Sequence, residues 1–202
     1  MENRKKYGIY GGSFDPIHIG HVALADSAVR ECGLDKLIFM PAYISPFKQD
    51  RHVTDGHDRC RMIEAALGTN SAFCLSRYEL SKEGPSYTVE TLRHWKKLLD
   101  GEMFFILGFD SAVQVDQWHE GAEILTDYHL ITARRPDTDF EDGMRILDSF
   151  REKYGAEITV MDMLPVDASS TQIRNLIKEG KPITGLVPPG VEDYIIEHQL
   201  YK

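Results

Sequence analysis

Short apolar runs alternate along this chain with longer segments in which apolar residues recur at helical spacing. The runs predict strands at residues 7–10, 37–40, 103–107, 129–132 and 157–160. The longer segments predict helices at residues 20–31, 56–67, 88–99, 144–154, 171–178 and 191–198. Because strand and helix alternate at this spacing, we expect βαβ units that build a parallel sheet flanked by helices. The predicted fold class is therefore α/β.

The chain has the size and composition of one well-packed domain. Its 202 residues are 42% apolar and 27% charged, and no repeat, low-complexity tract or linker divides them. We expect a single domain over residues 1–202, with a C-terminal helical segment at 170–202. No apolar run approaches the roughly 20 residues of a membrane span. Three scattered cysteines suit reduced thiols in a cytosol, so we expect a cytoplasmic protein that does not bind membranes.

The charge of the chain limits the ligands that it can attract. A net charge of −9 argues against a general nucleic-acid binder, which would present a basic face. A phosphate-bearing ligand would need local attraction from arginines, helix N-termini or a metal ion. Since ligands of open α/β sheets bind beyond the carboxyl ends of the strands, the informative residues should follow the strands.

The first predicted strand is followed by the string G-G-S-F-D-P-I-H-I-G-H, residues 11–21, and then by an amphipathic helix. The string is neither a Walker loop nor a dinucleotide-binding fingerprint, because it lacks both Gly-Lys-Ser/Thr and G-x-G-x-x-G. Gly11 and Gly12 would let backbone N–H groups approach a ligand closely. Gly20 would leave room for a phosphate at the positive end of the helix dipole.

Two histidines of this string, His18 and His21, lie three residues apart. On the first turn of a helix this spacing places both imidazoles on one side. Two imidazole donors aimed at one phosphate suit charge that develops on phosphoryl oxygens. The alternative is an exposed turn with two incidental histidines. The complete string, set between a strand and a helix, favours the functional interpretation.

The string resembles the signature of the nucleotidyltransferase superfamily that carries H-x-G-H. The resemblance implies a Rossmann-like parallel sheet, in agreement with the alternation above. It implies that His18 and His21 bind ATP phosphates and stabilise in-line attack on the α-phosphorus. Pyrophosphate then leaves, and no covalent enzyme intermediate forms. By the same resemblance, ATP is bound by Gly11, Gly12, Ser13 and Phe14, and Asp15 binds the acceptor, the substrate that receives the adenylyl group of ATP.

A second string, A-S-S-T-Q-I-R at residues 168–174, immediately precedes a predicted helix. Ser169 with Gln172 three positions later fits a capping box, which is a purely structural role. Free N–H groups at a helix start, hydroxyls and Arg174 would also suit phosphate oxygens. The string resembles the second signature of the superfamily, with Ala168 at the usual isoleucine position. The resemblance implies contacts to the ATP phosphates from Ser169, Ser170, Thr171 and Arg174.

The middle of the chain should select the acceptor. The segments E-G-P-S-Y-T at 83–88, G-F-D at 108–110 and A-R-R at 133–135 each follow a predicted strand or open a predicted helix. With these segments the chain resembles the bacterial nicotinate mononucleotide adenylyltransferases over nearly its whole length.

This second resemblance implies individual roles in the middle of the chain. Trp118 would stack on the pyridine ring, and the backbone at Tyr87 and Thr88 would receive the nicotinate carboxylate. Lys48 would lie near the acceptor phosphate or the reacting phosphates. The remaining ATP contacts would come from Gly108, Asp110 and Arg134. As structural alternatives, Trp118 is a half-buried packing aromatic and Thr88 a helix N-cap.

The implied substrates are ATP and nicotinate mononucleotide. The expected cofactor is Mg²⁺ bound mainly through the ATP phosphates, since no carboxylate cluster with ligand spacing occurs, and no protein metal ligand is assigned. The dipeptide His57-Asp58 resembles that of metal phosphohydrolases, but Asp55 more plainly caps a helix there. The alternatives are an enzyme specific for nicotinamide mononucleotide or phosphopantetheine, or a non-catalytic nucleotide-binding module. The sequence also leaves open whether the protein forms a homo-oligomer.

Overall fold

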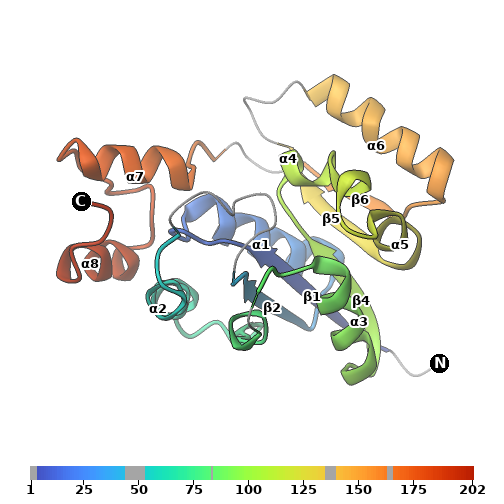
Figure 1. Cartoon of the computed structure of the whole chain (residues 1–202), viewed down its shortest axis with the longest axis horizontal. Helices are drawn as coiled ribbons and strands as arrows, with labels where there is room; N and C mark the ends of the chain where they lie inside the picture. Colours follow the sequence, from blue (N-terminus) through green and yellow to red (C-terminus); the bar gives the residue numbers. More distant parts are fainter. Residues whose placement is uncertain (1–3, 44–52, 83, 135–139, 163–165) are drawn as a thin grey trace.

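Six parallel strands form the centre of the computed structural model (Figure 1), which describes residues 4–43, 53–82, 84–134, 140–162 and 166–202. The strands are β1 (Lys5–Gly12), β2 (Lys36–Pro41), β3 (Phe73–Leu75), β4 (Gly101–Ile106), β5 (His129–Ala133) and β6 (Ile158–Met161). Their order is β3-β2-β1-β4-β5-β6, and every neighbouring pair is parallel. The predicted parallel α/β sheet is confirmed.

Helices connect the strands and cover both faces of the sheet. They are α1 (Ile19–Cys32), α2 (Gly56–Leu67), α3 (Thr88–Leu98), α4 (Phe109–Ala112), α5 (Gly121–Asp127), α6 (Phe140–Tyr154), α7 (Ser170–Lys178) and α8 (Pro189–Glu197), with 3₁₀ turns η2 (Glu79–Ser81) and η3 (Val115–Gln117). In Figure 1, α2, α7 and α8 lie on one side of the molecule, and α4, α5 and α6 lie on the other.

The prediction from sequence fails mainly for short elements. It lacks the edge strand β3, which has only three residues and pairs with β2 alone. It also lacks the short helices α4 and α5. Helix α6 begins at Phe140, whereas the sequence predicts a start at residue 144. The prediction begins too late because Glu141, Asp142 and Gly143 interrupt the apolar period. Helix α2 has its predicted bounds, and Asp55 caps it by accepting the His57 N–H at 2.7 Å.

Alternating strand residues divide the core between the two faces of the sheet. Tyr10 and Ile106 belong to a cluster with apolar residues of α1, α2, α7 and α8, which we call the first face. Ile9 and Phe105 belong to a cluster with apolar residues of α3, α4, α5 and α6, which we call the second face. Because both faces are covered, the central strands consist of nearly continuous apolar runs.

The chain winds outward from β1 in two directions. It passes from β1 to β2 and β3, and then returns to the other side of β1 with β4. At such a reversal the connections diverge and leave a crevice beyond the carboxyl ends of the strands. The residues just after β1 therefore lie where a ligand of this fold is expected.

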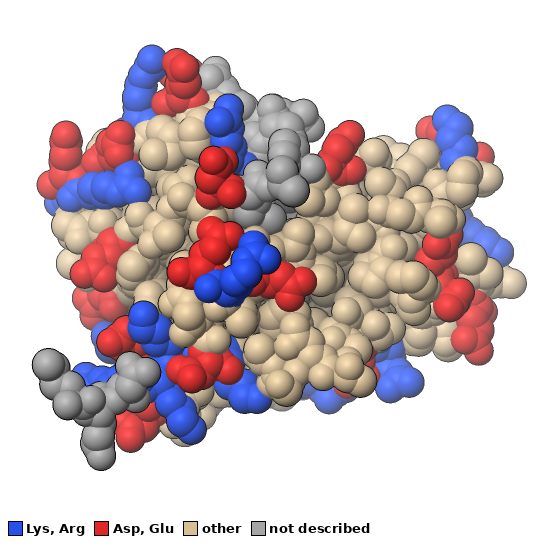
Figure 2. All heavy atoms as spheres, turned by 180° about the vertical axis from the view of Figure 1, so that it is seen from behind, with Lys and Arg blue, Asp and Glu red and all other residues tan. Residues whose placement is uncertain are grey.

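The surface shown in Figure 2 carries acidic and basic side chains intermixed, without a continuous basic stripe among the coloured residues. This agrees with local rather than global attraction of phosphate groups. Among the described residues, no helix has the length and apolar character that crossing a bilayer requires.

Candidate active site

A cavity of about 330 Å³ lies beyond the carboxyl ends of β1, β2 and β4. Its apolar base consists of Ile9, Met40, Phe105 and Leu107, which all belong to the second face. A cavity with an apolar base and a few polar groups is typical of a small-molecule site. The predicted site residues that line it are Gly11, Gly12, Ser13, Tyr87, Thr88, Asp110 and Trp118.

The two histidines lie at the start of α1, on the first face of the sheet. His18 is the N-cap residue, and its Nδ1 accepts the N–H of Gly20 at 3.2 Å. The backbone N–H of His18 in turn donates to Nδ1 of His21 at 3.2 Å. The ring centroids are 3.7 Å apart. The structure therefore brings both imidazoles together on one side of the helix start, as their spacing predicts.

These hydrogen bonds assign the proton of each ring. A nitrogen that accepts a backbone N–H cannot itself carry hydrogen, so each neutral imidazole is protonated at Nε2. The capping role uses Nδ1, and Nε2 is the donor of each ring. His18 is only 2% exposed. In such a desolvated position a hydrogen bond to an anion is stronger than in water.

Aromatic packing supports this helix start from the core. Phe14 is buried, and its φ of 49° lies in the left-handed region that bulky residues rarely adopt. Its ring packs edge-on against His21, with centroids 5.0 Å apart. The buried ring of Phe14 thus supports His21. The predicted contact of Phe14 with ATP would therefore come from the backbone of Phe14. A Cβ at Gly20 would come within 3.1 Å of the His18 ring, so this glycine makes room for the imidazole.

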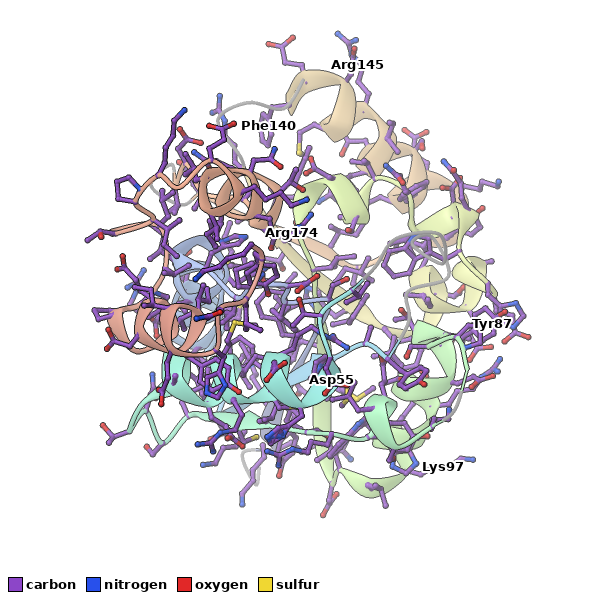
Figure 3. The ribbon with its side chains drawn as sticks, turned by 60° about the vertical axis from the view of Figure 1, so that its left-hand side comes forward. Asp55, Tyr87, Lys97, Phe140, Arg145 and Arg174 are labelled. Carbon is purple, nitrogen blue, oxygen red and sulfur yellow. The ribbon has the colours of Figure 1, made fainter. Side chains whose placement is uncertain are left out.

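The second string forms the start of α7. The N–H of Gln172 donates to Ser169 Oγ at 3.1 Å, and the N–H of Ser169 donates to Gln172 Oε1 at 3.3 Å. The predicted capping box is confirmed. In Figure 3 the labelled Asp55 and Tyr87 are the N-cap residues of α2 and α3, and the labelled Arg174 lies in the middle of α7.

Two side chains of α7 bind the loop that follows β1. Ser170 Oγ donates to the carbonyl of Pro16 at 2.9 Å, and Arg174 Nη1 donates to the carbonyl of Asp15 at 2.6 Å. Arg174 Nη2 donates to Oγ1 of the exposed Thr171 at 3.2 Å. A guanidinium has more N–H groups than these bonds use, so Arg174 can hold the loop and still bind an anion. The structure thus joins two strings that lie far apart in the sequence.

Asp15 lies in a buried network and not in the lining of the cavity. Its carboxylate, 6% exposed, accepts from the Tyr201 hydroxyl at 2.7 Å and the Thr54 N–H at 3.4 Å. Arg59, 2% exposed, donates to the carbonyls of Ser13 at 2.8 Å and Thr54 at 2.9 Å. The structure therefore places Asp15 where it holds the loop after β1, and its predicted contact with the acceptor finds no counterpart in the cavity lining.

The network contains ionisable side chains whose pKa values are shifted from their ordinary values. Burial lowers the pKa of Arg59, and the neighbouring Asp15 carboxylate opposes that shift. Burial raises the pKa of Tyr201, and Asp15 raises it further. Sequence reasoning missed Arg59 and Tyr201. For Arg59 a signal existed, because this arginine lies among the buried residues Cys60, Met62 and Ile63 on the apolar side of α2.

Another part of the cavity wall consists of the start of α3 and the aromatic side chains of Tyr87 and Trp118. Tyr87 is the N-cap residue of α3 and Thr88 its first residue, so the interpretation of Thr88 as the cap is wrong. Among the described residues, no side chain caps this helix. The half-buried Trp118 meets Phe105 edge-on at 6.2 Å between centroids. The ring of His119, a residue that sequence reasoning missed, lies 4.5 Å from that of Tyr87.

The other predicted ATP contacts follow β4 and β5. Gly108 is the N-cap residue of α4, and Asp110 within α4 lines the cavity. Arg134 follows β5, is exposed, and has its guanidinium carbon 4.6 Å from the centre of the Phe140 ring. Lys48 lies outside the described residues. Within the part of the chain that the structure describes, no three His, Cys, Asp or Glu side chains gather as a metal site.

Known proteins share these features. A cytidylyltransferase-like family model matches residues 9–176, a range that contains both strings. A probable nicotinate-nucleotide adenylyltransferase of Clostridium perfringens is 37% identical over 199 residues, which cover 98% of each chain. The chain belongs to the nicotinate-nucleotide adenylyltransferase family. A second probable member, from Desulfitobacterium hafniense, is 39% identical over 98% of this chain and 96% of its own.

Solved structures share this fold. A nicotinic acid mononucleotide adenylyltransferase of Plasmodium falciparum, complexed with NaAD, has the same fold with a TM-score of 0.80. The two chains are 23% identical, and the match covers 98% of this chain and 97% of the other. As a member of the nicotinate-nucleotide adenylyltransferase family, the protein is a nucleotidyltransferase. The resemblance inferred from its strings is confirmed.

The buried network predicts a stability effect in this nicotinate-nucleotide adenylyltransferase family member. Tyr201→Phe removes the hydroxyl that donates to the buried Asp15 carboxylate. We expect the free energy of unfolding to fall by about 1.5–3 kcal/mol, as for a hydrogen bond to a charged group. Urea unfolding measures this change.

Tyr194→Phe is the matched control for Tyr201→Phe. Tyr194 also donates to a carboxylate, that of the half-buried Asp58, at 2.9 Å. Since water can replace this bond, its loss should lower the free energy of unfolding by less than about 1 kcal/mol. Equal effects of the two substitutions would contradict the role given to the network.

Proposed function

We propose that this protein transfers the adenylyl group of ATP to nicotinate mononucleotide. The products are nicotinate adenine dinucleotide and pyrophosphate, a step of NAD biosynthesis. The observation that carries the proposal is that the H-x-G-H and S-S-T-x-I-R strings meet beside a cavity with Tyr87, Thr88 and Trp118 in its wall. The nicotinate-nucleotide adenylyltransferase relatives support the same acceptor.

The two substrates would approach the loop after β1 from opposite faces of the sheet. Nicotinate mononucleotide would occupy the cavity on the second face, with its ring against Trp118. The ATP phosphates would lie near the starts of α1 and α7 on the first face, where helix dipoles and Arg174 attract anions. Gly11 and Gly12, which border the cavity, lie between these positions.

The reaction would be a single displacement at phosphorus. A phosphate oxygen of nicotinate mononucleotide attacks the α-phosphorus of ATP and forms the new P–O bond. The bond to the oxygen that bridges the α- and β-phosphates breaks, and its electron pair leaves with pyrophosphate. His18 and His21 would donate their Nε2–H groups to phosphate oxygens whose negative charge increases in the transition state. Their fixed geometry requires no reorganisation during the reaction.

The location of the reaction follows from the chemistry of the chain. Cys32, Cys60 and Cys74 are free thiols in the structure. Free thiols are usual in the reducing cytoplasm, where ATP is also available. We therefore propose that the protein acts there.

The proposed reaction depends on Mg²⁺ that arrives with ATP. Hydroxyls, imidazoles and Arg174 surround the expected phosphate position, a set that suits phosphate oxygens and leaves the ion to phosphates and water. When bound, Mg²⁺ neutralises the phosphate oxygens and assists the departure of pyrophosphate. We expect excess EDTA to abolish turnover and added MgCl₂ to restore it, as measured by pyrophosphate release. Full activity in EDTA would refute this requirement.

Replacement of His18 separates its two roles. Asparagine is among the best N-cap residues, so His18→Asn keeps an acceptor for the start of α1 but removes the Nε2 donor. We expect kcat to fall by about 10²–10³-fold, with little change in the KM for ATP. His57→Asn, at an exposed histidine of α2, is the control and should keep normal kinetics. A normal kcat with a raised KM for ATP in His18→Asn would contradict a role in the transition state.

The start of α3 predicts preference for nicotinate over nicotinamide mononucleotide. Its uncapped N–H groups suit a carboxylate, whereas a carboxamide would turn N–H donors of its own toward them. Such sites reject the wrong analogue by as much as about 10⁴–10⁵. The comparison of kcat/KM for the two acceptors measures this preference. Trp118→Ala should weaken both acceptors in similar proportion, because stacking does not read the substituent. Comparable kcat/KM values for the unmodified protein would refute the assignment.

A further inference from the structure

A buried carboxylate that the proposed reaction does not use lies in the wall of the cavity. Glu79, in η2, is 6% exposed and lines the cavity together with Tyr87 and Thr88. Burial raises the pKa of its carboxyl group, and hydrogen bonds from Thr91 and Ser86 act against that shift. A hydrophobic side chain would fill the same volume without the cost of desolvating a carboxylate. What Glu79 provides and a hydrophobic side chain cannot provide is hydrogen bonding to its neighbours.

The partners of Glu79 lie on both sides of the start of α3. Thr91, 3% exposed and in the first turn, donates from Oγ1 to Glu79 Oε1 at 2.7 Å. Ser86, which precedes the N-cap residue Tyr87, lies close enough to the same carboxyl group to lower its pKa. Ser86 Oγ also accepts the N–H of Tyr43 at 3.0 Å, just after β2. One carboxylate thus connects η2, the segment before α3 and the first turn of α3.

The first turn of α3 carries the N–H groups that the proposed function assigns to the nicotinate carboxylate. Most helices fix their first turn with a Ser, Thr, Asp or Asn N-cap. Here the N-cap residue is Tyr87, and no side chain among the described residues caps the helix. The direction of these N–H groups therefore depends on contacts made from outside the helix. Glu79 provides one of them through its hydrogen bond with Thr91, and it also lies beside Ser86.

We propose that Glu79 is a positioning residue for recognition of the nicotinate carboxylate, an inference that rests on the proposed function. By holding Thr91, Glu79 fixes the first turn of α3 so that its N–H groups point toward the ligand carboxylate. A carboxamide requires a different donor pattern, so the same rigidity favours nicotinate over nicotinamide mononucleotide. Glu79 acts through α3 and does not take part in the transfer of the adenylyl group.

Two conservative substitutions test the proposal in the full-length protein. Glu79→Gln keeps the shape of the side chain and replaces one acceptor oxygen by an NH₂ donor, whereas Thr91→Val removes the hydroxyl that binds Glu79. We expect the KM for nicotinate mononucleotide to rise about tenfold in each variant, as for the loss of one net hydrogen bond. The KM for ATP and kcat should stay within about twofold, because the ATP side of the loop is unaffected. The preference over nicotinamide mononucleotide should shrink.

Glu90→Gln is the matched control. Glu90 lies in the same turn of α3, but it is exposed and pairs with Lys82 at 2.9 Å. Lys82 lies near enough to Glu79 to lower the pKa of its carboxyl group, but neither Lys82 nor Glu90 is given a hydrogen bond to Glu79 or Thr91 among the described residues. Glu90→Gln should therefore leave all kinetic constants unchanged. A tenfold rise in the KM for nicotinate mononucleotide in this control would overturn the proposal.

Calorimetric titration of nicotinate mononucleotide, in the presence of Mg²⁺ and a non-hydrolysable ATP analogue, gives a readout besides turnover. Each variant should bind about tenfold more weakly, and the double variant should lose less than the sum of the two single losses, because both substitutions act on the same hydrogen-bond network. Unchanged affinity in Thr91→Val, or equal losses for ATP and nicotinate mononucleotide, would overturn the proposal. If Glu79→Gln does not fold, the affinity of Thr91→Val for nicotinate mononucleotide tests the proposal by itself.

Different results would contradict the proposed function and the role of Glu79. If the unmodified protein makes no nicotinate adenine dinucleotide, the proposed function is wrong. If the unmodified protein is active and both variants keep its KM for nicotinate mononucleotide, only the role of Glu79 is wrong.

Discussion

Side chains that lie far away in the sequence hold the loop between β1 and α1 from several sides. Arg59 of α2 binds the carbonyl of Ser13, while Arg174 and Ser170 of α7 bind the carbonyls of Asp15 and Pro16. Buried backbone carbonyls need hydrogen-bond donors, and here side chains provide them where neither helix nor sheet continues. The loop consequently has one conformation, and that conformation sets the start of α1 with its two imidazoles. The rest of the site depends on this arrangement.

The topology explains why such a loop can serve two substrates. β1 is central, and its residues alternate between a face covered by α1, α2, α7 and α8 and a face covered by α3 to α6. The loop after β1 lies at the edge where the two faces meet. The cavity adjoins it from the second face, and the paired histidines adjoin it from the first. Under the proposed function, a phosphate from each substrate would therefore reach the loop without either substrate crossing the sheet.

Much of this could be predicted from the sequence because the signals are local. Apolar periodicity gave the long helices and the central strands, and the spacing of Ser169 and Gln172 gave the capping box. The side-by-side placement of His18 and His21 was also predictable, because their spacing puts both on one side of the first helical turn. The short strand β3 lacks enough residues to show a period. For elements of this length, pairing with a neighbour decides the structure, and a single sequence does not show that pairing.

Several roles in the site depend on contacts between distant parts of the chain. Asp15 has the position of a ligand-binding residue in its string, yet its carboxylate bonds to Tyr201, 186 residues away. Burial of Arg59 and Glu79 likewise results from packing between elements, and an isolated charged residue in a sequence usually indicates a solvent-exposed position. The folded chain thus contains site residues that line the cavity and site residues that hold the loop after β1. The recognisable strings include members of the second kind, namely Asp15, Ser170 and Arg174, whereas Arg59 and Glu79 belong to no string.

The central claim is that the site transfers the adenylyl group directly from ATP to the acceptor bound on the opposite face of the loop. A single displacement at phosphorus inverts its configuration, whereas transfer by way of a covalent enzyme intermediate inverts it twice. The most direct measurement uses one diastereomer of ATP with sulfur on the α-phosphorus, Mg²⁺ and nicotinate mononucleotide, and determines the configuration of the dinucleotide product by ³¹P NMR. The account predicts inversion. Retention of configuration would contradict it.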